Sequence, residues 1–141
     1  MTRFWVVLAV AVGGALGTIA RYELALAEPA GSGRFPWATF IVNVVGSFVL
    51  GFALAALTES WSPSRLVRPL VAVGFCGGLT TFSTWMVESV LLVRDGATGT
   101  AVLYVAASLV IGFGAAALGV TTARAALPGS GPFSFDPRAD D

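Results

Sequence analysis

The hydrophobic positions of this chain fall into four long runs that are separated by short polar segments. A helix needs about 20 predominantly apolar residues to cross the hydrocarbon core of a bilayer. Each run reaches that length, so the pattern predicts four membrane-spanning helices over residues 4–27, 36–58, 69–93 and 100–123. Pro, Gly, Ser and charged residues fill the segments between them, as expected of loops. The predicted fold is an all-α membrane protein.

A change of composition at Pro128 divides the chain into two parts. Residues 1–127 are predicted to form one four-helix unit. Residues 128–141 are rich in Pro, Gly, Ser and Asp, which predicts a disordered tail.

The first run has an alternative interpretation as a cleavable signal peptide. Arg3 precedes it, and the small residues at 25–27 resemble a cleavage site. However, the charge-free stretch over residues 4–20 is longer than a typical signal core, and Arg21 and Glu23 precede the supposed cut. A retained membrane helix is therefore the preferred interpretation.

The composition is typical of a protein that is embedded in lipid. Of its 141 residues 56% are hydrophobic and only 11% are charged, against about 25% charged in soluble domains. Eight Arg balance eight acidic residues, so no basic surface predicts a nucleic-acid partner. One Cys and no His offer too few ligands for a zinc site and exclude His-based catalysis. We therefore expect membrane transport without enzymatic activity.

The arginines give only a weak prediction of orientation. One side of the membrane would hold Arg3, Arg65, Arg68, Arg124 and Arg138, and the other would hold Arg21, Arg34 and Arg94. This bias either favours the N-terminus inside slightly or indicates that the chain inserts in both orientations. A chain of the second kind can pair with an inverted copy of itself, and both options stay open here.

Polar residues follow one face of the second predicted helix. Thr39, Asn43 and Ser47 recur every four residues and so share a face. Asn43 lies seven residues past Pro36, about 10 Å into the membrane. Its amide could serve a transported ion, or it could bind a neighbouring helix, as Asn commonly does in membranes. The two interpretations have equal weight.

The third predicted helix contains an unusual polar segment. Residues 77–84, Gly-Gly-Leu-Thr-Thr-Phe-Ser-Thr, combine two glycines with four hydroxyl residues at mid-membrane depth. A break there would free carbonyls for a small cation and expose donors for an anion. The alternative is a continuous helix with Gly74 and Gly78 as a close-packing face. The density of polar residues favours the break.

Further candidate residues flank this segment. Phe82, Trp85 and Glu88 recur every three residues along one face, and the positive edges of the two rings could face a passing anion. Tyr104 and Ser108 form a polar stripe on the fourth helix. Arg21 near the end of the first helix either snorkels to the interface or forms a basic vestibule. This excess of donors suits a small, strongly hydrated anion.

Three blocks of sequence resemble the CrcB/Fluc family of fluoride channels. The first is Gly13-Gly14-Ala15-Leu16-Gly17-Thr18-Ile19-Ala20-Arg21-Tyr22, the second is Thr39-x-x-x-Asn43-x-x-Gly46-Ser47-Phe48, and the third covers residues 74–84. They occur in the family's order across about residues 8–120. The third block is highly specific, and the first two are moderately so.

The resemblance implies a fold, a function and a set of site residues. It implies an antiparallel, dual-topology dimer of four-helix subunits with a broken third helix. Two pores at the subunit interfaces would conduct fluoride passively across the cell inner membrane and lower its cytoplasmic concentration. The partners would be fluoride, the lipid bilayer and a second subunit, in a homodimer or a heterodimer. The implied pore and fluoride-binding residues are Asn43, Phe82, Ser83, Thr84, Trp85, Glu88, Tyr104 and Ser108, with Arg21 in a vestibule. Gly77 and Thr80 would offer carbonyls to a structural Na⁺ at the dimer centre.

The chain departs from the family pattern at several positions. The family's paired phenylalanines become Phe82 and Trp85. Because some members work as two different subunits, each of which has lost part of one pore, Trp85 could mark such a partner. Gly112 replaces an expected Ser and removes a hydroxyl, whereas Ala38 and Thr18 replace Gly and Ala without evident consequence.

Two other functions compete with fluoride conduction. A small multidrug-type proton antiporter also has four short helices, but it needs an acidic residue deep in the first helix, and residues 1–20 contain none. A helical scaffold subunit would tolerate replacement of Asn43 and Phe82 with little effect beyond stability. Fluoride conduction is the leading prediction.

Overall fold

The computed structural model describes residues 2–29, 31–60 and 65–127, and within these ranges the regular structure is helical. The elements are α1 (Thr2–Ala27), α2 (Trp37–Ala55), the π-helical turn η1 (Ala56–Ser60), the π-helical segment η2 (Pro69–Phe75), α3 (Cys76–Leu79), α4 (Phe82–Arg94) and α5 (Thr98–Ala126). The predicted tail over residues 128–141 lies outside the described residues.

Four helical stretches of the described chain are long and apolar enough to cross a membrane. They run over Arg3–Ala27, Trp37–Thr58, Pro69–Arg94 and Thr98–Ala126. Each differs from its predicted span by at most three residues at either end. The prediction of four apolar helices, typical of a multi-pass membrane protein, is therefore confirmed.

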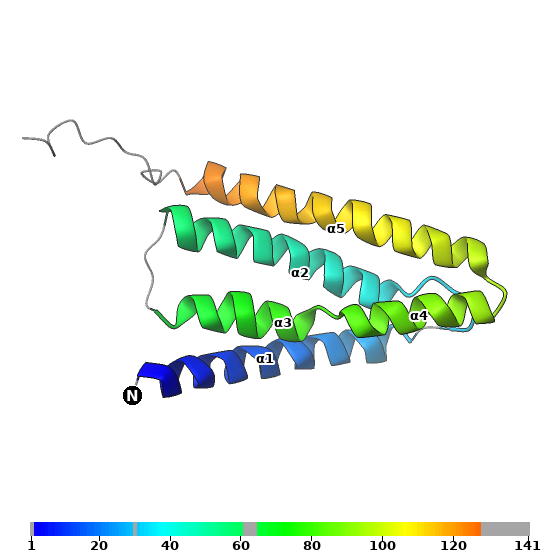
Figure 1. The fold of residues 1–141 in the computed structure, drawn as a ribbon, viewed down its shortest axis with the longest axis horizontal. Coiled ribbons are helices and arrows are strands. Elements are labelled where there is room, and N and C mark those ends of the chain that lie inside the picture. Colours follow the sequence, from blue (N-terminus) through cyan, green and yellow to red (C-terminus); the bar gives the residue numbers. More distant parts are fainter. Residues whose placement is uncertain (1, 30, 61–64, 128–141) are drawn as a thin grey trace, which may run out of the picture.

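The third span connects two helix pairs. α1 packs along η2 and α3, and α2 packs along α5. The second half of the span, α4, packs against α5 instead of α1. In Figure 1 the third span accordingly lies between α1 and α2, and its two halves have different neighbours.

Small residues allow these helix pairs to approach closely. A Cβ atom added to Gly17 of α1 would collide with the carbonyl oxygen of Phe75, and one added to Gly51 of α2 would collide with that of Ala116. Such contacts between small residues are a common means of helix association in lipid. Gly17 and Gly51 therefore lie on close-packing surfaces of α1 and α2.

The third span is interrupted at two threonines. α3 ends at Leu79, Thr80 has φ −81° and ψ 156°, Thr81 has φ −149° and ψ 123°, and α4 begins at Phe82. Gly78 lies inside α3, against the carbonyl of Gly14. The extended residues therefore follow the glycines, of which Gly78 packs on α1 and Gly77 has open space beside it.

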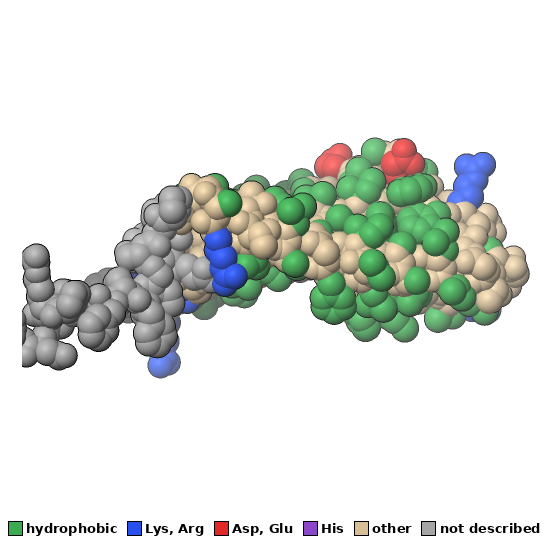
Figure 2. Space-filling model, turned by 90° about the horizontal axis from the view of Figure 1, so that it is seen from above, with side chains coloured by type: hydrophobic (Ala, Val, Ile, Leu, Met, Phe, Trp, Pro, Cys, Tyr) green, Lys and Arg blue, Asp and Glu red, His purple; other side chains and the backbone are tan. Residues whose placement is uncertain are grey.

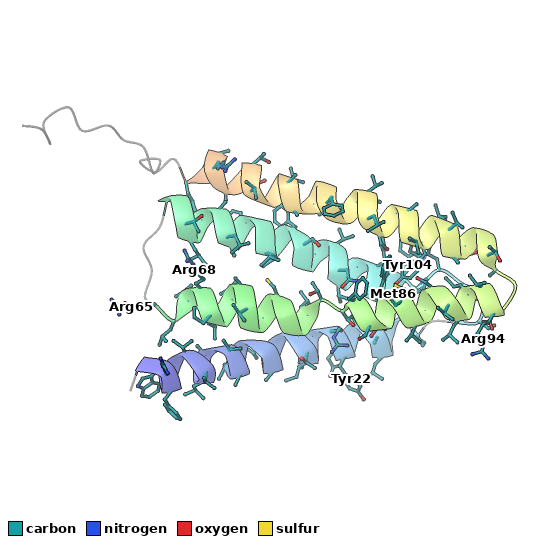
Figure 3. All side chains as sticks on the ribbon, viewed as in Figure 1. Tyr22, Arg65, Arg68, Met86, Arg94 and Tyr104 are labelled. Carbon is teal, nitrogen blue, oxygen red and sulfur yellow. The ribbon has the colours of Figure 1, made fainter. Side chains whose placement is uncertain are left out.

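The outer surface of the helices is largely apolar. Phe82 is 72% exposed and Phe113 is 75% exposed, and many Val and Leu side chains also point outward. Figure 2 shows apolar side chains over much of the described surface, with arginines toward its two ends. In Figure 3 Arg65 and Arg68 lie at one end of the bundle and Arg94 lies at the other. This distribution fits a bundle surrounded by lipid.

Candidate functional site

Asn43 binds the interruption of the third span. Its Nδ2 donates to the carbonyl of Thr81 at 3.1 Å, and its Oδ1 accepts from the Thr81 N–H at 2.8 Å. One amide side chain therefore satisfies both backbone groups of a residue that has left the helix, as a strand partner would. An amide is suited to this pairing because it carries a donor and an acceptor side by side. Asn43 holds Thr81 in its extended conformation.

Thr81 also caps α4. Its hydroxyl accepts from the Thr84 N–H at 3.2 Å and donates to the Thr84 hydroxyl at 3.0 Å, and its Oγ lies 3.4 Å from the Ser83 Oγ. Side-chain oxygens at this position satisfy N–H groups that have no partner inside the helix. Three hydroxyl groups consequently gather at the N-terminal end of α4, where the helix dipole is positive.

Glu88 is held by hydroxyl donors from two other helices. Thr39 of α2 donates to its Oε1 at 2.8 Å, and Tyr104 of α5 donates to its Oε2 at 2.7 Å. Thr39 and Tyr104 are both buried, and Figure 3 shows Tyr104 where α5 meets the rest of the bundle. The contact between Thr39 and Glu88 was not predicted, although Thr39 shares its helix face with Asn43.

Arg21 contacts the C-terminal end of α3. Its Nε donates to the carbonyl of Gly78 at 3.1 Å, and its side chain is half-buried. Helix C-termini carry unpaired carbonyls and a negative dipole end, so a guanidinium there is favourable. Arg21 therefore reaches the interrupted span and does not only extend to the interface.

Several of the polar side chains described above line one pocket. Its charged and hydroxyl lining consists of Arg21, Glu28, Thr39, Thr81, Thr84 and Glu88. Glu28 was absent from the predicted site, although it follows Arg21 by two helical turns and so shares its side of the chain. The pocket brings one guanidinium and two carboxyl groups beside the donors at the start of α4.

Aromatic side chains form the next layer along α4. The rings of Phe82 and Trp85 lie 5.4 Å apart, and those of Trp85 and Tyr104 lie 6.4 Å apart. Phe82 is exposed, whereas Tyr104 is completely buried. The predicted face of Phe82, Trp85 and Glu88 thus borders α5 at one end and the surface of the bundle at the other.

Ser108 lies away from the Glu88 pocket. It lines a groove between α2 and α5 together with Ser47, Gly112 and Phe113. Its buried Oγ has no hydrogen-bond partner in the described part of the chain, and neither has the Nε1 of Trp85.

The two residues predicted to bind a cation differ in environment. Gly77 is exposed within α3 and has open space beside its Cα. Thr80 has left the helix, and its hydroxyl donates to the Cys76 carbonyl at 2.9 Å. No group of three or more His, Cys, Asp or Glu gathers among the described residues. A cation here would depend on backbone and hydroxyl oxygens, which are the ligands that alkali ions prefer.

Comparison with known proteins identifies the family to which this chain belongs. The family model described as "CrcB-like protein, Camphor Resistance (CrcB)" matches residues 8–120. The chain is 48% identical over 125 residues to the "Fluoride-specific ion channel FluC 3" of Streptomyces avermitilis, which covers 89% of this chain and 61% of that protein. It is 50% identical over 104 residues to FluC 2 of the same species, covering 74% and 66%.

A third relative is closer in length. The chain is 48% identical over 120 residues to the "Fluoride-specific ion channel FluC" of Chlorobium luteolum, covering 84% of this chain and 92% of that protein. The chain therefore spans less than two thirds of the two Streptomyces relatives but nearly the whole of the Chlorobium protein.

Proposed function

This chain belongs to the CrcB-like family, and on that premise we propose that it is a passive, fluoride-selective channel of the cell inner membrane. The observation that supports this most is the interruption at Thr80 and Thr81, which Asn43 binds. It gathers hydroxyl and backbone donors at the start of α4, inside an otherwise apolar membrane span. The identity of the ion, fluoride, is taken from the names of the relatives.

The proposed path begins at the polar pocket. Arg21 raises the local concentration of anions, and the N-terminal end of α4 attracts negative charge at the bottom of the pocket. A fluoride ion that leaves water must exchange its hydration shell for protein donors. In our proposal the hydroxyls of Ser83 and Thr84 take part in that exchange. Beyond them the partially positive ring edges of Phe82 and Trp85 would face the ion.

We place the carboxyl group of Glu88 in the wall of this path. Both of its oxygens already accept hydrogen bonds, from Thr39 and Tyr104. In our proposal Glu88 orients these two hydroxyl residues and keeps them at the wall of the path. The antiporter alternative has no specific support, because the charged residues of α1 lie outside its apolar core and Glu88 is engaged by two donors.

We further propose that two copies, or two related subunits, assemble antiparallel. In one chain the side chains of Phe82 and Ser83 are exposed, so each path lacks a wall until a second subunit covers it. The weak arginine bias permits both orientations. In such a dimer the carbonyls of Gly77 and Thr80 from two chains could surround a structural Na⁺, since two carbonyls from one chain are too few for a coordination shell.

Fluoride efflux from proteoliposomes tests the proposed function. Purified chain in liposomes loaded with fluoride or chloride should release fluoride, without an energy source, once a potassium ionophore dissipates the membrane potential. Chloride should be retained. Asn43→Asp keeps the acceptor for the Thr81 N–H but offers no donor to its carbonyl, so it should abolish release. Folded protein that releases no fluoride, alone or with a related subunit, would refute the proposal.

A further inference from the structure

An apolar groove runs between α4 and α5 on the outside of the bundle. Its floor contains Ser89 and Ala101, which are buried, and its rims include Val90 and Val102, which are both more than half exposed. The Ser89 hydroxyl donates to the Trp85 carbonyl at 2.7 Å, so the floor offers no unpaired polar side chain. The part of a ligand that fills this groove must therefore be apolar.

The groove faces away from the candidate site. Val102 and Ala106 line it, and each is two residues from Tyr104, which is about 200° around the axis of α5. Tyr104 is completely buried at the candidate site. Along α5 the groove extends from Ala101 to Leu109, about 12 Å, and the hydrocarbon of one leaflet is about 15 Å deep. The groove thus matches much of the length of a lipid acyl chain.

One charged side chain lines the groove at its end. Arg94 belongs to the last turn of α4 and is exposed, and its guanidinium has no hydrogen-bond or ion-pair partner among the described residues. The adjacent Asp95 accepts a hydrogen bond from Ser32 at 2.7 Å instead. Figure 3 shows Arg94 at the end of the bundle, which is the level of the lipid headgroups. A positive charge is therefore available where lipid phosphates lie.

The apolar groove at the opposite end of the bundle, between α2 and η2, differs in this respect. Its lining is entirely apolar. The neighbouring Arg68 already donates to the Leu57 carbonyl at 3.0 Å. Of these two grooves in the described part of the chain, the one between α4 and α5 is lined by a guanidinium that is available to a ligand.

We propose that the groove between α4 and α5 binds an anionic phospholipid, with one acyl chain in the groove and the headgroup phosphate on Arg94. Basic groups beside transmembrane helices recognise anionic headgroups in this way. A phosphatidylcholine chain fits the groove equally well, but its choline cancels the charge of its phosphate, so net charge decides between the two lipids. This site goes beyond fluoride conduction and does not depend on it.

Photolabelling of the full-length protein tests the site. The protein is reconstituted in phosphatidylcholine vesicles that contain a trace of phosphatidylglycerol with a diazirine in one acyl chain, and labelled peptides are mapped by mass spectrometry. Labelling should concentrate on residues 89–94 and 101–109. Added phosphatidylglycerol should suppress it in a saturable manner, whereas free inorganic phosphate should not. Suppression by phosphate alone would contradict a site that needs the acyl chain.

Three variants complete the test. Arg94→Gln should raise the mole fraction of phosphatidylglycerol for half-suppression about fivefold, the usual contribution of one basic residue at a membrane surface. Arg34→Gln removes the same charge from an exposed residue at the same end of the bundle, outside the groove, and should have little effect. Ala106→Trp places a ring in the groove from an exposed position and should abolish labelling there.

Three results would overturn the site. The first is an equal effect of Arg94→Gln and Arg34→Gln, which would reduce the role of Arg94 to general surface charge. The second is labelling spread evenly over the outward faces of α1 and α5. The third is a groove without label, as expected if a second subunit covers it.

Discussion

Replacement of Asn43 by Ala should separate the two extended threonines from α2. Asn43 makes two hydrogen bonds to the Thr81 backbone, at 3.1 and 2.8 Å, and both are partly shielded from solvent. Without them the N–H and the carbonyl of Thr81 lose their partner. An unpaired buried group costs about 1–3 kcal/mol, although hydrogen bonds between membrane helices average only about 0.6 kcal/mol. We therefore expect a loss of about 1–4 kcal/mol in the free energy of unfolding.

The stability of the variant can be compared with that of a matched neighbour. Val45 lies two residues further along α2 and is 47% exposed to the surrounding medium. Val45→Ala should thus change stability much less than Asn43→Ala. Reversible unfolding by SDS in mixed micelles, followed by far-ultraviolet circular dichroism, gives both values. If the two variants unfold at the same SDS fraction, Asn43 does not hold Thr81 in the way described, and the explanation of the interruption fails.

Three further predictions concern other contacts of the bundle. Gly17→Val should destabilise the protein by several kcal/mol, since its Cβ meets the Phe75 carbonyl and overpacking commonly costs about 1–3 kcal/mol or more; Gly114→Val, with open space beside it, is the control in the same unfolding assay, and equal losses would contradict the packing. Tyr104→Phe should lower stability by about 1 kcal/mol and leave one oxygen of Glu88 without its donor, which infrared spectroscopy of the carboxyl stretch would detect as a shift; an unchanged band would argue against the contact. Arg21→Gln should slow fluoride release in low salt more than in high salt, because screening already weakens the attraction of anions; an equal effect at both ionic strengths would assign Arg21 only to the Gly78 carbonyl.

The apolar pattern predicts the spans because lipid imposes a length and excludes charge. This constraint acts on each helix separately, so no knowledge of packing is required. The close-packing glycines of α1 and α2 were predictable for a similar reason, because only small residues allow two backbones to approach. Gly17 and Gly51 could therefore be assigned before their partners were known.

The contacts of the candidate site were harder to predict from the sequence. Asn43 and Thr81 lie 38 residues apart, and Thr39 and Glu88 lie 49 apart. Nothing in the local pattern pairs them. The glycines of the third span were also poor markers of its extended residues, since Gly78 packs on α1 as part of a helix. The residues that leave the helix are Thr80 and Thr81, where a side chain from α2 supplies the missing backbone partners.

Selective, passive conduction of fluoride is the function that we propose for this chain. Its most direct test is the reversal potential of purified protein in a planar bilayer, with sodium fluoride on one side and an equal concentration of sodium chloride on the other. For a fluoride-selective channel we expect a current that reverses far from zero, at the sign expected for fluoride moving down its gradient. A reversal potential at zero, or at the value for sodium or chloride permeation, would contradict it.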